Sequence, residues 1–194
     1  MRPEMSTSRI DGIVIGGSAG ALEALDSLLP ALPARFPAAV FVVLHLPRER
    51  PSMLAEVYAA KCALPVEEAE DKTRVRPGMV YFAPPDYHLL IEQGRCLALS
   101  VDEPVNLSRP SIDVLFESAA DVYGPSLMGI ILSGASADGA AGLAAVRAAG
   151  GLTVVQEPAS AAVPLMITSA LERCAVDYVL PLAQITDLLG RIQK

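Results

Sequence analysis

Short runs of consecutive apolar residues alternate along the chain with longer segments in which apolar residues recur every three or four positions. The runs at residues 12–16 and 40–44 are typical of strands buried on both faces, because a strand with one solvent-facing side would alternate apolar and polar residues. Between them, residues 21–29 space their leucines as one face of a helix requires. We therefore expect the chain to begin with a strand, a tight turn, a helix and a second strand.

This alternation continues to the C-terminus. Further strands are predicted at 127–132, 152–156 and 176–180, and further helices at 52–60, 111–123, 138–149, 164–173 and 183–192. Apolar strands joined by amphipathic helices predict an α/β fold, namely a three-layer sandwich with a mostly parallel, doubly wound sheet. Such sheets bind ligands at the carboxyl ends of their strands.

A different pattern interrupts the alternation in the middle of the chain. Residues 79–83, 88–92 and 96–101 are short extended segments, separated by a Pro-Pro pair and by a Gln-Gly pair. Tight turns that contain Gly commonly join antiparallel strands. We expect these three segments to form a small antiparallel insertion.

Composition restricts the class of protein. With 194 residues, 52% apolar and 19% charged, the chain is long and apolar enough for a single domain spanning 1–194, in which we expect residues 1–10 to be flexible. Its 15 Lys and Arg against 22 Asp and Glu give a net charge of −7. That sign is wrong for binding the phosphates of nucleic acid, so nucleic acid is not an expected partner.

Membrane insertion, secretion and metal binding are not expected either. The densest apolar run, residues 38–44, is far shorter than the roughly 20 residues that span a bilayer. Residues 1–11 hold no apolar stretch of the kind found in secretory signals, so we expect the chain in the cytoplasm. Three cysteines, none in a Cys-x-x-Cys spacing, indicate neither a disulfide framework nor a thiolate metal site, and no cofactor is predicted.

The turn after the first predicted strand, residues 16–20, matches G-x-S-x-G, which lifts a serine hydroxyl above a sheet. Its glycines suit a nucleophile in a strained backbone conformation, and the start of the next helix offers N–H groups to an oxyanion. The dinucleotide and P-loop patterns fail, because Ser18 and Ala21 stand where the first requires glycine and no Gly-Lys-Ser/Thr follows. Ser18 is a candidate nucleophile, and a serine that only caps the helix is the alternative.

A serine nucleophile needs a base, and the chain has two histidines. His45 follows the strand at 40–44, with Pro47 preventing its continuation, so it should emerge at the same edge of the sheet as Ser18. A core or strand-end histidine without a catalytic role is the alternative. For His88, which opens a strand of the predicted insertion, we expect a structural role or a place at the rim.

The carboxylate that would orient the imidazole is expected after the strand at 127–132, where Asp138 stands at a helix start. An Asp before Gly at a helix start is also a common N-cap or turn residue. Three strand ends nevertheless carry Ser, His and Asp, where such sheets build their sites. The chain order Ser, His, Asp differs from the Ser, Asp, His order of α/β-hydrolases, so that fold is not expected.

Seven segments between residues 13 and 189 resemble the catalytic domain of the CheB family, the chemotaxis protein-glutamate methylesterases. They are 15–20, 45–47, 75–78, 83–88, 109–113, 137–142 and 156–158. The resemblance implies a triad of Ser18, His45 and Asp138. It also implies hydrolysis of glutamyl methyl esters on the cytoplasmic helical bundle of chemoreceptors, with glutamine deamidation in many members, and it places residues 109–113 near the cleft. Read by itself, that stretch is a helix start capped by Ser108 or Ser111.

The chain departs from the family pattern beside the candidate triad. Ala19 and Ala21 replace the usual Thr and Gly of the nucleophile loop, Leu44 replaces a Gln, and Ala135 and Ser136 replace Met and Gly of the aspartate loop. The usual receiver domain is not expected in the ten or so residues before the first strand. The alternatives to a receptor methylesterase are therefore a signalling domain that keeps the receptor-binding surface without efficient chemistry, and a general hydrolase of small esters.

Overall fold

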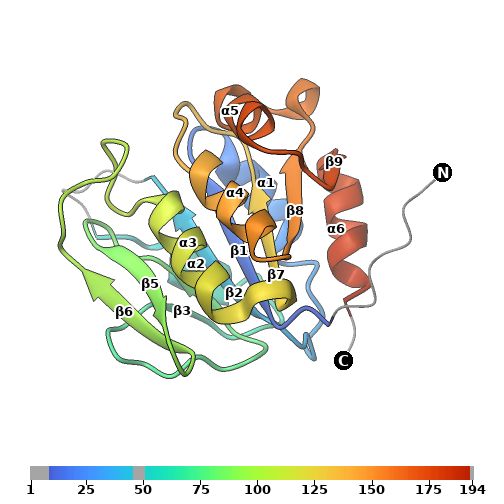
Figure 1. Cartoon of the computed structure of the whole chain (residues 1–194). Helices are drawn as coiled ribbons and strands as arrows, with labels where there is room; N and C mark the ends of the chain where they lie inside the picture. The colour runs from blue at the N-terminus through green and yellow to red at the C-terminus, as the bar shows by residue number, and fades with distance from the viewer. Residues whose placement is uncertain (1–8, 46–50, 193–194) are drawn as a thin grey trace.

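The computed structural model describes residues 9–45 and 51–192, and its central element is a seven-stranded sheet in the order β3-β4-β2-β1-β7-β8-β9 (Figure 1). The strands are β1 (Gly12–Gly17), β2 (Ala39–Leu44), β3 (Val66–Glu68), β4 (Val80–Phe82), β7 (Leu127–Ile131), β8 (Leu152–Gln156) and β9 (Tyr178–Leu180). They pair in parallel throughout. All residues of β1 and β2 are buried, as their uninterrupted apolar sequence predicts.

Helices cover both faces of the sheet, which confirms the predicted three-layer α/β sandwich. They are α1 (Ala21–Leu28), α2 (Leu54–Ala59), α3 (Ile112–Tyr123), α4 (Ala140–Ala148), α5 (Leu165–Arg173) and α6 (Leu182–Gly190), with 3₁₀ turns at Gly124–Ser126 and Pro158–Ser160. One apolar core joins α1, α2 and α6 to the sheet, and a second joins α3, α4 and α5 to the opposite face. Figure 1 shows α3 and α4 side by side in front of the strands.

The antiparallel insertion is smaller than the sequence suggested. It consists of β5 (His88–Glu92) and β6 (Cys96–Ser100), which pair with each other and lie beside α3 (Figure 1). The segment at 79–83 was wrongly assigned to the insertion, because it contributes β4 to the main sheet, in parallel with β2 and β3. The three residues of β4 are all buried, which suits a sheet covered on both faces rather than a two-stranded hairpin.

The topology brings three loops together at the carboxyl edge of the sheet. β1 lies between β2 and β7, with Gly17 beside Leu44 and Gly16 beside Ile131. The segments that follow these three strands therefore emerge at one edge, with the loop after β1 in the middle. The chain builds one half of the sheet from β1 to β4 and the other half from β7 to β9, so the strand order changes direction between β1 and β7. Open α/β sheets bind ligands at the carboxyl ends of the strands beside such a switch point.

No helix within residues 9–45 and 51–192 is both long and apolar enough to cross a bilayer. β2 ends at Leu44, and His45 follows it directly. Pro47, which was expected to stop this strand, lies outside the described residues, as do residues 1–8 of the expected flexible N-terminus.

Candidate active site

Ser18 is held at the middle of the carboxyl edge by main-chain hydrogen bonds to both neighbouring strands. Its N–H donates to the carbonyl of Ser133 after β7 (2.9 Å), and the N–H of His45 after β2 donates to the carbonyl of Gly17 (3.3 Å). The pairing of the sheet thus continues one residue beyond the strands. As a result, Ser18 and His45 are neighbours on adjacent strand ends.

The turn from β1 into α1 depends on glycine, but not because Ser18 is strained. Gly20 takes the left-handed conformation, with φ of 81°, whereas Ser18 is not among the residues with positive φ. The prediction that Ser18 has a strained backbone is therefore wrong, because the left-handed residue of the turn is Gly20, two positions later. Gly17 is needed for space, since a Cβ there would lie 2.4 Å from the Cβ of Ala21.

The imidazole of His45 is bound to a buried carboxylate. Its Nε2 lies 2.8 Å from Oδ2 of Asp138, and the exposed fraction is 15% for the His45 side chain and 0% for that of Asp138. A carboxylate only accepts hydrogen bonds, so Nε2 carries the proton of the neutral ring and Nδ1 is the unprotonated nitrogen. Within the described residues, the Ser18 hydroxyl forms no hydrogen bond, and α1 has no side-chain cap.

Five donors converge on the Asp138 carboxylate. Besides His45, they are the backbone N–H groups of Ile112 and Asp113, the hydroxyl of Ser111 and the amide of Asn106, at 2.6 to 3.2 Å. Burial acts to raise the pKa of Asp138, but these hydrogen bonds outweigh burial and hold the pKa below its ordinary value. Asp138 is therefore ionised at neutral pH and can stabilise a protonated imidazole.

Asp138 caps a helix, although not the one it precedes. The N-cap residue of α4 is Gly139, and Asp138 does not cap that helix; its carboxylate instead binds the first two N–H groups of α3. Ser111, one of the two caps considered from the sequence, occupies the N-cap position of α3 but donates its hydroxyl to Asp138. The cap of α3 thus comes from the loop after β7, which fixes that loop to the helix.

Asn106 and Asp113 belong to the same polar cluster, and the sequence analysis did not assign them to it. The Asn106 amide donates to Oδ2 of Asp113 (2.7 Å) as well as to Oδ1 of Asp138. Asp113 also accepts the N–H groups of Gly139 and Gly142 (2.9 and 2.6 Å). Burial raises the pKa of Asp113, and the negative charge of Asp138 raises it further. The hydrogen bonds from Asn106, Gly139 and Gly142 act in the opposite direction. The one sequence signal was the family-like stretch at 109–113.

The backbone N–H groups around the turn differ in whether they are free to bind a substrate. That of Gly134 donates to the carbonyl of Val163, and that of Ala21 closes the turn after β1. No acceptor within the described residues is found for the N–H groups of Ala19 and Ala135. The N–H of Ala21 is therefore not free for the oxyanion expected at the start of this helix, whereas those of Ala19 and Ala135 are among the available donors.

A second set of contacts joins the loops after β1 and β7. Ser133 Oγ donates to the carbonyl of Ala19 (2.6 Å) and accepts the N–H of Val163 (2.9 Å). Met166 packs on Gly134, where a Cβ would lie 2.5 Å from the Met166 Cε. These contacts tie the serine loop to the carboxylate loop without involving the imidazole.

His88 has the structural role that the sequence favoured. It is buried, its Nδ1 accepts the N–H of Ser111 (3.1 Å), and its Nε2 lies 3.1 Å from the carbonyl of Glu103. Both ring nitrogens are occupied, so His88 positions the residue before α3 rather than acting as a base.

The site thus brings together a serine hydroxyl, an imidazole and an ionised carboxylate, the groups used in nucleophilic catalysis by serine. All three residues predicted from the sequence lie at the same edge of the sheet. No group of three or more His, Cys, Asp or Glu side chains suited to a metal ion is found in the described parts of the chain.

Comparisons with known proteins agree on a single family. Residues 13–189 match the family model described as CheB methylesterase. A protein of Leptospira interrogans is 45% identical over 184 residues, which are 95% of each chain. A Bordetella parapertussis protein-glutamate methylesterase/protein-glutamine glutaminase is 41% identical over 179 residues, which are 90% of this chain and 51% of that protein.

A solved structure has the same architecture. The crystal structure of the Thermotoga maritima CheB methylesterase catalytic domain superimposes with a TM-score of 0.90 and is 34% identical in sequence. The match covers 95% of this chain and 99% of that one. The arrangement of sheet, helices and hairpin described above is therefore the fold of that domain.

Proposed function

The chain belongs to the CheB methylesterase family, and we propose that Ser18, His45 and Asp138 are the catalytic triad with which it hydrolyses glutamyl methyl esters of chemoreceptors. The observation that carries this proposal is the 2.8 Å contact between the imidazole and the buried Asp138 carboxylate, at the strand end beside Ser18. We further propose that the reaction takes place in the cytoplasm, on the helical bundle of methyl-accepting receptors.

In the first step, Ser18 Oγ attacks the ester carbonyl carbon while Nδ1 of His45 takes the hydroxyl proton. Nδ1 is the only ring nitrogen that can do so, since Nε2 already donates to Asp138. The new Oγ–C bond leaves a negative charge on the carbonyl oxygen. Collapse of this intermediate breaks the bond to the methoxy group, which leaves as methanol with the proton from Nδ1.

In the second step, water attacks the acyl group on Ser18, and Nδ1 of His45 again takes the proton. The Oγ–C bond breaks, Ser18 recovers its hydroxyl proton, and the product is a glutamate side chain. The same sequence of steps on a glutamine side chain releases ammonia instead of methanol, which matches the second activity in the name of the Bordetella protein.

Asp138 serves this cycle by fixing the imidazole and balancing its charge. The carboxylate is fully buried and bound by five donors, so it cannot rotate away when His45 becomes protonated. Its low pKa means that it remains ionised and does not take the proton itself. Each turnover therefore places the transient positive charge of the ring beside a fixed negative one.

The developing oxyanion needs donors on the side of the ester away from His45. We assign this role to the N–H groups of Ala19, in the same loop as Ser18, and of Ala135, in the neighbouring loop after β7. Removing one such donor typically lowers turnover by about 10²- to 10³-fold. Because these donors are backbone groups, the replacement of the family's usual Thr and Met at these positions is compatible with this role.

Labelling with a serine-directed fluorophosphonate tests whether Ser18 is activated. Mass spectrometry should locate the label on Ser18, and His45→Gln should abolish labelling, because the hydroxyl then has no base. Absence of label in the folded, unmodified chain would contradict the proposal and favour a signalling domain without catalysis. Labelling at another serine would remove Ser18 from the mechanism.

A further inference from the structure

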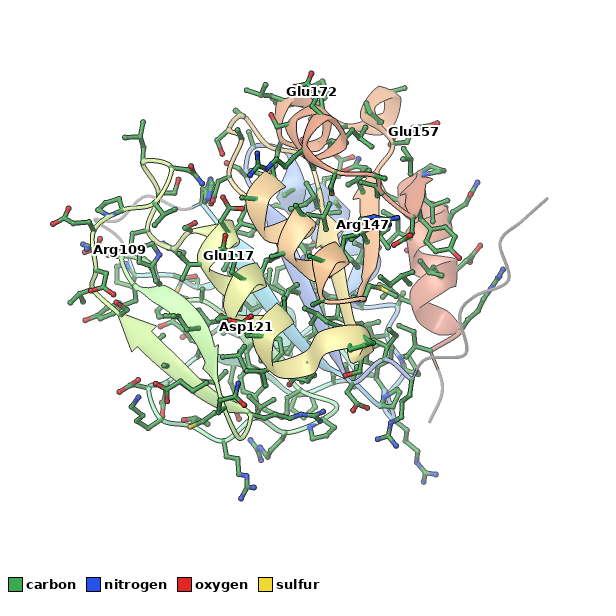
Figure 2. All side chains as sticks on the ribbon, viewed as in Figure 1. Arg109, Glu117, Asp121, Arg147, Glu157 and Glu172 are labelled. Atoms are coloured by element: carbon green, nitrogen blue, oxygen red, sulfur yellow. The ribbon has the colours of Figure 1, made fainter. Side chains whose placement is uncertain are left out.

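Asn106 is presented by a tight turn between the hairpin and α3. Val105 and Ser108 exchange both backbone hydrogen bonds (3.1 and 2.9 Å), and the two residues between them have positive φ, 50° at Asn106 and 62° at Leu107. Asn adopts this left-handed conformation more readily than most residues. Arg109, labelled in Figure 2, donates to two carbonyl groups of the preceding segment and so holds the base of the turn.

The side chain of Asn106 reaches from this turn into the buried polar cluster. Its amide nitrogen has two hydrogens, and it lies 2.7 Å from Oδ2 of Asp113 and 2.9 Å from Oδ1 of Asp138. The two carboxylates are 6% and 0% exposed, so little water can screen their repulsion. A neutral amide supplies a hydrogen-bond donor to each of them without adding a charge.

The two carboxylates also depend on each other through the backbone. Asp113 binds the N–H of Gly139, the residue that follows Asp138, and Asp138 binds the N–H of Asp113. Asn106 closes this ring of contacts from the solvent side. The charged or titratable groups facing Asp138 are His45, which follows β2, and, from α3, Asp113 and at longer range Glu117, the last labelled in Figure 2.

We propose that Asn106 is a positioning residue of the triad: by bridging Asp113 and Asp138, it fixes the Asp138 carboxylate against Nε2 of His45. This inference rests on the proposed function, because it assigns Asn106 to the reaction through Asp138. Asn106 itself acts on the carboxylates and not on the ester.

Asn106→Asp is the sharpest test, because Asp has nearly the same shape and also tolerates the left-handed turn, but replaces the two donors by a third negative charge. We expect kcat/KM for methanol release from methylated receptor membranes to fall about tenfold or more, mainly through kcat. The acidic limb of the pH profile should move to higher pH, since Asp138 would hold a proton more tightly. Asn106→Ala should show a smaller shift in the same direction.

Leu107→Ala is the matched control, since it changes the same turn at a residue that is 94% exposed and keeps the Asn106 amide in place. Its pH profile should equal that of the unmodified chain. A folded Asn106→Asp variant with unchanged kcat/KM and pH profile would overturn the inference, and should that variant not fold, Asn106→Ala decides by the same comparison.

Failure of the proposed function has a different signature. In that case methanol release from the unmodified chain would be absent or would persist in Ser18→Ala. The ¹H resonance of His45 Nε2–H then tests the positioning role without turnover. It should move upfield or broaden in Asn106→Ala, and an unchanged resonance would overturn the inference.

Discussion

Asp113 and Asp138 exchange helix caps. Each carboxylate binds backbone N–H groups at the start of the helix that contains or follows the other residue. Asp138, which precedes α4, accepts the first two N–H groups of α3, and Asp113 of α3 accepts those of Gly139 and Gly142 at the start of α4. The charges favour both helix N-termini, where carboxylates are stabilised by the free N–H groups. One exchange of caps therefore joins two helices and also sets the orientation of the triad carboxylate.

Replacing the triad carboxylate should separate its catalytic role from its capping role. We expect Asp138→Asn to lower kcat for methanol release by about 10⁴-fold, the size of the effect in a serine protease, because the amide favours the wrong tautomer. Asp121→Asn, on the exposed surface of α3 (Figure 2), is the control and should be unaffected. A fall below about tenfold would mean that Asp138 serves only to cap α3.

The pKa of Asp138 predicts a pH dependence of stability. Since its pKa is lowered on folding from an ordinary value of about 3.9, its contribution is complete well above that value and is lost as the pH falls through the folded pKa. The difference in free energy of unfolding between the unmodified chain and Asp138→Asn should therefore shrink below about pH 4. Urea denaturation between pH 7 and pH 3 measures it, and a difference that stays constant would contradict the assigned pKa direction.

The contact between His45 and Asp138 predicts which imidazole nitrogen is protonated. In ¹⁵N NMR spectra of the neutral ring, Nε2 of His45 should carry the proton, and Nδ1 should show the shift of an unprotonated nitrogen. His88 should show the same tautomer because its Nδ1 accepts a backbone N–H, so a His45→Gln variant is needed to assign the signals. A proton on Nδ1 of His45 would contradict the proposed base.

Two glycines with nearly equal φ separate backbone strain from crowding in the serine turn. Gly20 and Gly94 have φ of 81° and 82°, but a Cβ at Gly20 would lie 2.6 Å from Ala162 Cβ, whereas one at Gly94 would meet nothing within 4 Å. Gly94→Ala should cost about 1 to 2 kcal/mol in the free energy of unfolding and leave activity unchanged. Gly20→Ala should cost more and also lower turnover. Equal losses of stability would show that packing around Gly20 is loose.

The sequence was sufficient for features that depend on backbone topology. Uninterrupted apolar runs identified β1, β2 and β7 as buried parallel strands, and the residues after such strands meet at one edge whatever the side chains between them. This is why Ser18, His45 and Asp138 could be nominated from three distant loops.

Other features depend on contacts that no local pattern encodes. β3 was not predicted, because only one of its three residues is apolar and it lies at the edge of the sheet. β4 was placed in the hairpin, because a short apolar run does not specify its partner strand. Asn106 and Asp113 were not assigned to the site, because their role lies in side-chain bonds between a turn and two helix starts.

Methanol release from methylated chemoreceptor membranes tests the catalytic role of Ser18 most directly. The unmodified chain and Ser27→Ala, a change at an exposed serine of α1, should release methanol at the same rate. Ser18→Ala should reduce the release to background while its circular dichroism spectrum stays unchanged. Continued methanol release by a folded Ser18→Ala variant would contradict the account.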